Sequence, residues 1–166
     1  MRMTVAGVAA AAWLQTFTPD PFQVRTELQS LYDESSQALL QFDTEKDVDQ
    51  FHDVLCTPDW TFVDAAGVRH TWADTRADEI RTLGEPRADS IVQMIDKLTI
   101  DGGGASTTVR RTTVRTIVDA DGRYGRRGAS RTITETTTFR DAWVRSADTW
   151  RQKSRAQNGP SKTVVG

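Results

Sequence analysis

The sequence predicts one α+β domain in which three N-terminal helices pack against a cone-shaped, curved antiparallel β-sheet. Three observations support this fold class. The chain has 166 residues, a length typical of a single domain. Capping residues and helical spacing of apolar residues lie mainly before Ser90, whereas segments rich in Thr, Val and Arg, separated by Gly-containing turns, follow it. Helices grouped before a run of strands are typical of α+β rather than alternating α/β folds.

The first two helices are predicted from the residues that cap their N-termini. Asp20 precedes Pro21, a residue suited to the first helical position. Helical spacing of apolar residues then predicts a helix over residues 21–42. Thr44 is suited to cap a second helix, which we expect to end at Pro58.

One strand and a third helix follow, and then a meander of strands. Trp60–Asp64 is rich in β-forming residues and leads into a turn where Gly67 can take a positive φ. Asp74–Leu83 is predicted to be a short helix, because Gly84 and Pro86 stop it. Four further strands are predicted, at Ile91–Ile100, Ala105–Val118, Ser130–Arg145 and Thr149–Ala156.

The two ends of the chain are expected to lie outside this domain, which spans residues 21–157. Residues 1–18 contain one basic residue and then an Ala-rich apolar run with an Ala-x-Ala arrangement. Two interpretations remain open for them, a secretory signal peptide or a disordered N-terminus. The first implies a secreted or periplasmic protein and the second a cytoplasmic one. Residues 158–166 are expected to form a flexible tail.

The formal net charge of −2 conceals two blocks of opposite charge. Between Asp20 and Gly103, 18 acidic residues stand against 7 basic ones. Between Gly104 and Arg155, 5 acidic residues stand against 12 basic ones, eleven of them Arg. The blocks correspond largely to the helical layer and the sheet, and we expect them to compensate each other partly. The near-neutral total and the few aromatic residues among the arginines argue against nucleic-acid binding.

Cysteine and histidine usage narrows the chemistry further. Cys56 is the single cysteine, which excludes an internal disulfide and a multi-cysteine zinc site. The two histidines, His52 and His70, do not suggest a metal site, and no Gly-rich phosphate loop is present, so we expect no cofactor. No apolar run is long enough to predict a membrane span. Carboxylates are left as the candidate catalytic groups.

Two motifs resemble those of the nuclear transport factor 2-like superfamily. They are Thr57-Pro-Asp-Trp-Thr-Phe-Val-Asp-Ala-Ala-Gly67, and Thr138-Phe-Arg-Asp-Ala-Trp-Val-Arg145 followed by Trp150-Arg-Gln-Lys-Ser154. Together with the order of elements, they make residues 21–157 similar to the SnoaL-like and calmodulin-kinase-association-type branches. The resemblance implies a cone with a small-molecule pocket and a homodimer formed through the sheet. It does not by itself imply an activity.

Asp64 is the first catalytic candidate. Strand alternation places it on one face with Trp60 and Phe62, where desolvation at the mouth of an apolar pocket would suit it to proton abstraction. Resemblance to the ketosteroid isomerase branch implies a general base here, an Asp followed closely by Gly, as Asp64 is by Gly67. Ala65 departs from that pattern, which usually has Pro. The other interpretation is that Asp64 starts a turn and accepts backbone N–H groups.

The resemblance implies two further polar groups. Glu135 is similar to the second acid of the isomerases, whose protonated form donates to an oxyanion. Its other interpretation is an ion pair with a neighbouring Arg. Tyr32 is similar to the helix-borne Tyr of these enzymes, although its spacing to Asp64 is longer by about one turn. The alternative is that its ring packs in the core.

The expected ligand pocket contains Trp60, Phe62, Tyr32, His70, Trp72 and Met94. Three hypotheses for function follow. The first is a non-catalytic module that binds a hydrophobic small molecule. The second is a cofactor-independent isomerase, cyclase or dehydratase with Asp64 as base and Glu135 as acid, which one open cavity receiving both carboxylates would favour. The third is a dimerisation scaffold whose interior is filled by side chains.

Overall fold

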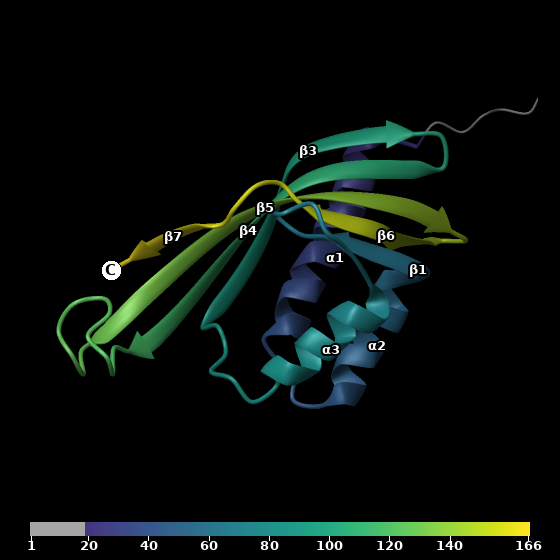
Figure 1. The fold of residues 1–166 in the computed structure, drawn as a ribbon. Helices are drawn as coiled ribbons and strands as arrows, with labels where there is room; N and C mark the ends of the chain where they lie inside the picture. Colours follow the sequence, from purple (N-terminus) through teal and green to yellow (C-terminus); the bar gives the residue numbers. More distant parts are fainter. Residues whose placement is uncertain (1–18) are drawn as a thin grey trace, which may run out of the picture.

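The computed structural model describes residues 19–166, and Figure 1 shows helices covering one face of a bent sheet. This arrangement confirms the predicted α+β class. The helices are α1 (Pro21–Leu39), α2 (Glu45–Leu55) and α3 (Trp72–Thr82). The strands are β1 (Cys56–Val63), β2 (Arg69–Thr71), β3 (Ser90–Asp101), β4 (Gly104–Val118), β5 (Ser130–Ser146), β6 (Thr149–Gln157) and β7 (Lys162–Val165). The predicted N-terminal segment 1–18 lies outside the described residues.

The helices begin where capping side chains satisfy their first N–H groups. Asp20 accepts from the backbone of Phe22, so α1 begins at the predicted residue. Thr44 forms a capping box at the start of α2, also as predicted. The third helix begins at Trp72, two residues earlier than expected, because Thr71 is the cap and Asp74 completes its capping box.

The strands form one mixed sheet in the order β2-β1-β6-β5-β4-β3. The four long strands make the predicted antiparallel meander. At one edge, however, β1 runs parallel to β6, which the sequence prediction of a purely antiparallel sheet missed. β1 also begins at Cys56 rather than at Trp60, and the register shifts between Cys56 and Thr61. Pro58, which has no N–H to donate, lies in this irregular part of the strand.

Two irregularities of register accompany the bend of the sheet. One lies in β3 between Ile95 and Lys97, and the other where β5 pairs with β6 between Ala142 and Trp143. Such bulges add local twist and curvature. In Figure 1 the helices lie beneath one half of the sheet, and β4 and β5 extend beyond them as an arm.

The arm also carries β7, in the segment that was expected to be a flexible tail. β7 pairs antiparallel with residues 133–136 of β5, next to the part of β5 that pairs with β6. Its backbone thus occupies an edge of β5 that would otherwise lack a partner. All four of its residues are exposed, so no alternation of buried and exposed residues marks the strand in the sequence.

The main core lies between α1 and the sheet. Val24, Leu28 and Tyr32, one turn apart on α1, are buried against Val109 and Trp143 of the sheet. This packing holds α1 against the middle of the meander. As a result, the C-terminal half of α1 borders the space that α2 and α3 also enclose.

Candidate functional site

A cavity of about 270 Å³ lies between the three helices and the sheet. Aromatic side chains make up much of its wall, namely Phe42, Phe51, Trp60, Phe62, Trp72 and Phe139. Eight polar or charged side chains also line it, namely Tyr32, Ser35, His52, Thr75, Glu79, Arg111, Gln152 and Arg155. An apolar cavity with a few convergent polar groups is the usual form of a small-molecule site.

His52 stands among the tryptophans of the cavity. Its ring stacks on Trp72 with centroids 3.8 Å apart and lies edge-on to Trp60 at 6.1 Å. The residue is only 5% exposed, and neither ring nitrogen has a hydrogen-bond partner among residues 19–166. The closest ionic group is Asp53, whose Oδ1 is 3.8 Å from Nδ1. Burial lowers the pKa of His52, so the imidazole is neutral at pH 7 and has unused hydrogen-bonding capacity.

Arg111 and Arg155 bring two guanidinium groups to the cavity. Each lies 4.7 Å from the centre of the Phe139 ring. Arg155 forms a bidentate pair with Asp141, with Nε at 2.9 Å from Oδ1 and Nη2 at 2.7 Å from Oδ2. The Arg111 guanidinium makes no hydrogen bond or ion pair with any of residues 19–166. Burial and the charge of Arg155 lower the pKa of Arg111 to about 10, so its guanidinium remains charged at pH 7.

Glu79 is the acidic side chain of the cavity. It shares a face of α3 with Trp72 and Thr75, at spacings of seven and four residues. Burial raises the pKa of Glu79, and the charge of Arg111 opposes this effect. The two side chains are not within ion-pair distance of 4.0 Å. The cavity therefore holds a carboxyl group and a cation that do not satisfy each other.

A buried polar network connects the cavity wall to the core. The Asp141 carboxylate accepts from Tyr32 Oη at 2.6 Å and from Gln152 Nε2 at 3.1 Å, in addition to Arg155. Gln152 in turn accepts from Trp60 Nε1 at 2.9 Å. Burial and the Asp141 charge raise the pKa of Tyr32, so its hydroxyl stays protonated. The network holds four lining residues, Tyr32, Trp60, Gln152 and Arg155, in place and leaves the Tyr32 hydroxyl committed to Asp141.

Four of the residues expected in the pocket line this cavity. Trp60, Phe62 and Trp72 contribute aromatic wall, and Tyr32 contributes its buried ring. Cys56 also lines the cavity, and burial raises the pKa of its thiol to about 12, which keeps it un-ionised.

Asp64, in the turn after β1, and His70, on β2, lie together and are not among the lining residues. Asp64 Oδ1 accepts from the backbone of Ala66 and Val68, each at 2.9 Å, and Oδ2 is 3.0 Å from His70 Nε2. The hydrogen bond from His70 and those from the backbone lower the pKa of Asp64. A general base at the mouth of an apolar pocket would have a raised pKa, so these contacts match the turn interpretation.

We predict that Asp64→Ala weakens the turn without changing ligand affinity. The variant loses the acceptor for two backbone N–H groups, so its urea unfolding midpoint should fall below that of the wild type. Affinity for a ligand of the cavity should change by less than about twofold, as expected of a substitution away from the site. A large loss of ligand affinity with an unchanged unfolding midpoint would contradict this prediction and would show that Asp64 belongs to the binding site.

Glu135 and Met94 also lie away from the cavity. Glu135 follows the same face of β5 as Thr137 and Phe139 but lies further along the arm, and its carboxylate accepts from Thr137 Oγ1 at 3.4 Å. Met94 lies on the opposite, uncovered face of the sheet and is 49% exposed. Alternation on β3 explains this, because Gln93 and Ile95 on either side are buried beneath the helices.

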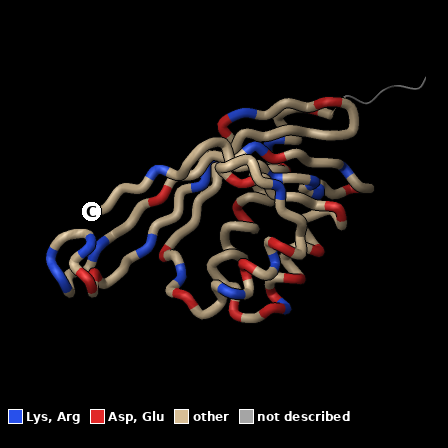
Figure 2. Tube along the Cα trace, in the orientation of Figure 1, with Lys and Arg blue, Asp and Glu red and all other residues tan. Residues whose placement is uncertain are grey.

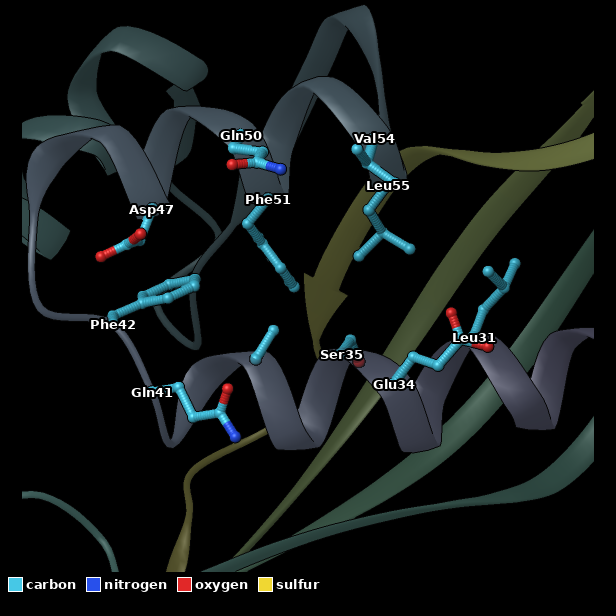
Figure 3. Close-up of a pocket in the computed structure, with 11 residues that line it drawn as sticks. Leu31, Glu34, Ser35, Gln41, Phe42, Asp47, Gln50, Phe51, Val54 and Leu55 are labelled. Carbon is cyan, nitrogen blue, oxygen red and sulfur yellow. The ribbon is translucent and has the colours of Figure 1, made fainter.

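A second hollow, of about 390 Å³, lies between α1 and α2. Figure 3 shows its apolar side chains between the two helices, with Asp47 and Gln50 among the polar residues around them. Ser35, Phe42, Phe51 and Leu55 line both this hollow and the cavity, and so form the wall between them.

The charged residues are distributed over the helices and the sheet as the sequence indicated. Figure 2 shows most acidic residues along the helices, and Lys and Arg prominent at the far end of the arm.

Within the described residues, no group of three or more His, Cys, Asp or Glu could hold a metal ion. In the same part of the chain, no helix is long and apolar enough to cross a membrane. Among the described residues that line the cavity, His52, Glu79, Arg111 and Arg155 are titratable or charged, in addition to Tyr32 and Cys56.

Known proteins resemble this chain in structure but not detectably in sequence. No family model matches, and no curated protein sequence matches. A conserved protein from Planctomyces limnophilus has a TM-score of 0.61 at 16% identity, covering 86% of this chain and 99% of its own. A nuclear transport factor 2-like superfamily protein from Salmonella enterica has a TM-score of 0.56 at 17% identity, covering 89% and 98%.

The hexachlorocyclohexane dehydrochlorinase LinA-type3 from Novosphingobium barchaimii has a TM-score of 0.55 at 10% identity, covering 86% of this chain and 91% of its own. These similarities confirm the expectation from the sequence motifs at the level of the fold. The chain has the fold of the nuclear transport factor 2-like superfamily. At these identities the fold does not define an activity.

The buried imidazole predicts a specific dependence of stability on pH. The pKa of His52 is lower in the folded protein than the value of about 6.5 in an unfolded chain. The unfolded state therefore binds more protons, and the stability due to neutral His52, complete above pH 6.5, is lost as pH falls below it. The free energy of unfolding should decrease between pH 7 and pH 5 by at most about 1.4 kcal/mol per pH unit from this residue.

Urea denaturation at several pH values tests this. His52→Phe keeps a ring against Trp72 and removes the titrating group, so its profile should be flatter than that of the wild type. His70→Gln keeps His52 and should retain this contribution to the slope. Parallel profiles for the wild type and His52→Phe would contradict the prediction.

Proposed function

We propose that this domain binds a small, partly aromatic molecule in the cavity beneath its helices. The observation that carries the proposal is His52, a buried imidazole with two unpartnered nitrogens in a cage of aromatic rings. Buried polar groups without a partner are rare because they lose hydration, and a ligand would supply the missing hydrogen bond. A cavity of about 270 Å³ lies at the small end of ligand sites, which suits one or two fused rings.

A screen of one- and two-ring aromatic compounds by thermal shift tests this proposal, because a ligand of the native state raises the melting temperature. Thr75→Phe on α3 should fill the cavity and abolish the shift, since Thr75 lines it. Thr82→Phe makes the same change at an exposed position of the same helix and should leave the shift intact. No stabilising compound, or equal shifts for both variants, would contradict the proposal.

A second candidate is cofactor-independent proton transfer, as in an isomerase, cyclase or dehydratase. It is favoured by a neutral imidazole, His52, in the same cavity as the cation Arg111. His52 would take a proton from a carbon next to a carbonyl, and Arg111 would stabilise the enolate oxygen. Asp64, the base suggested by the resemblance, is held in the turn by backbone N–H groups and by His70 of β2, so this candidate assigns the role to His52.

Hydrogen–deuterium exchange of 2-tetralone, a two-ring ketone, would reveal such proton transfer. We expect the wild type to accelerate exchange of its α-protons in D₂O, followed by NMR, and His52→Gln to abolish the acceleration. Exchange at the buffer rate with the wild type would contradict this candidate and leave the binding proposal intact.

We also propose that the domain forms a homodimer through the uncovered face of the sheet. Val92 and Met94 are exposed there although both are apolar, and association would bury them. Analytical ultracentrifugation should give twice the chain mass of 18.5 kDa for the wild type. Met94→Lys should shift the protein toward the monomer, and a monomeric wild type would contradict the proposal.

A further inference from the structure

Among the described residues that line the cavity, Arg111 brings a permanent charge that forms no ion pair. We infer that the ligand of this cavity is an aromatic carboxylate of one or two rings, whose carboxylate binds between Arg111 and Arg155. The inference rests on the proposed binding function and specifies the chemical class of the ligand.

The first step is the charge of the cavity without a ligand. Arg155 is neutralised by Asp141, with which it forms two hydrogen bonds. Arg111 has no such partner among the described residues, although Arg110, the preceding residue on β4, pairs with Asp96 on the other face of the sheet. A half-buried guanidinium is stabilised when an anion contacts it, so the cavity favours a ligand with one negative charge.

The second step is the donor geometry. Both guanidinium groups flank the ring of Phe139, each at 4.7 Å from its centre. Arg155 uses Nε and Nη2 for Asp141 and Gln93, so Nη1 makes no hydrogen bond within the described residues. None of the five N–H groups of the Arg111 guanidinium makes a hydrogen bond within residues 19–166. Planar, two-oxygen anions fit such forked donors, and carboxylates have that form.

The third step is the competing anion within the protein. Glu135 and Asp141 also attract Arg111, but Glu79 is the carboxyl group that lines the cavity with it, and no ion pair forms between Glu79 and Arg111. Rotation of its side chain toward Arg111 would give the guanidinium an internal partner and exclude the ligand. Replacing Glu79 is therefore a useful control. If its carboxylate competes with the ligand for Arg111, its removal should strengthen the binding of an anion, and in no case should the removal weaken that binding.

The remaining part of the cavity specifies the rest of the ligand. Trp60, Trp72 and Phe62 provide flat apolar surfaces, and His52 provides an unpartnered nitrogen beside them. An aromatic ring would stack against the tryptophans while the carboxylate contacts the arginines. The cavity volume of about 270 Å³ limits this ring system to one or two rings.

The test compares two probes of the same shape on the full chain. 2-Naphthoate is the anion and 2-naphthamide its neutral counterpart, and calorimetry gives the affinity for each. We expect the wild type to bind 2-naphthoate at least about tenfold more tightly, the scale of a charged hydrogen-bonded contact. Arg111→Gln should remove that preference and leave the affinity for 2-naphthamide within about twofold.

Three further variants separate the roles of the neighbouring charges. Arg110→Gln removes the adjacent Arg on the other face of β4 and should leave both affinities unchanged. Arg111→Lys keeps the charge but not the fork, so it should retain part of the preference. Glu79→Gln should bind 2-naphthoate as tightly as the wild type or more tightly. Because the Arg111 guanidinium makes no hydrogen bond or ion pair within the described residues, Arg111→Gln should fold and lose only its contact with the Phe139 ring, a small change that a melting curve checks.

The outcomes distinguish this inference from the proposal beneath it. Equal affinity of the wild type for both probes would overturn the inference about the anion and keep the binding proposal. An equal loss of 2-naphthoate affinity in Arg110→Gln and Arg111→Gln would overturn it as well, because a general surface potential would then explain the preference. Binding of neither probe would overturn the inference, whereas the thermal-shift screen with Thr75→Phe decides the binding proposal separately.

Discussion

Replacing Asp141 with Asn should lower the free energy of unfolding by about 3–5 kcal/mol, the cost of leaving a buried charge without its partner. The carboxylate is completely buried and accepts from Tyr32, Gln152 and Arg155. In the variant, an amide would have to turn one NH₂ group toward these donors, and the Arg155 guanidinium would lose its counter-charge. Urea denaturation of the wild type and the variant measures the difference.

Two comparisons make this prediction specific. Asp96→Asn also removes a carboxylate paired with an Arg, but at an exposed position, and should change stability by no more than about 0.5 kcal/mol. The double variant Asp141→Leu with Arg155→Met replaces both charges with apolar groups and should recover part of the loss, since Tyr32 and Gln152 still lose their acceptor. A loss in Asp141→Asn no larger than that in Asp96→Asn would contradict the prediction.

Truncating Leu28 to Ala should cost about 2–5 kcal/mol, the range for a leucine removed from a tightly packed core. Leu28 is 0% exposed and lies in the middle of α1, packed with Val24 and Tyr32 against the sheet. The loss includes both the transfer of the side chain and the void that the rigid sheet cannot close. Denaturant unfolding measures it.

Val54→Ala on α2 is the control, because Val54 is 67% exposed and should lose no more than about 0.5 kcal/mol. Leu28→Ala has a second expected effect, on the cavity itself. Tyr32 is one turn further along α1 and lines the cavity, so loosening the helix should also weaken binding of an aromatic probe. Stability of Leu28→Ala equal to that of Val54→Ala would show that α1 is not anchored as the structure describes.

The prediction of the elements from sequence succeeded where local chemistry determines them. Asp20 and Thr44 cap helices because their side-chain oxygens reach nearby N–H groups, an interaction between residues a few positions apart. The strands of the meander were recognised for a similar reason, since Thr and Val repeat over long segments between turns. β2 and β7 were not predicted, because each is short and exposed and exists only through pairing with a longer strand.

The same holds for the site: features that depend on residues close in sequence were predicted, and features that depend on tertiary packing were not. Trp60 and Phe62 were expected to share a face, because alternation along a strand is a local property, and both line the cavity. Met94 was assigned to the wrong side of its strand, since only the position of the helices shows which face of β3 is covered. Asp64 follows Phe62 by only two positions, but the chain turns there and its carboxylate binds backbone N–H groups of the turn instead of entering the cavity.

The sequence by itself determined the fold class, the capped helices and the Arg-rich character of the sheet, because these depend on residue type and spacing along the chain. The tertiary structure alone decided which charges have partners. Asp141 neutralises Arg155, from the adjacent strand, whereas Arg111 receives no partner from the described residues. His52 and Arg111 are 59 positions apart in the sequence. Only the packing of α2 over the sheet brings them to one cavity, since burial and pairing are properties of neighbours in space.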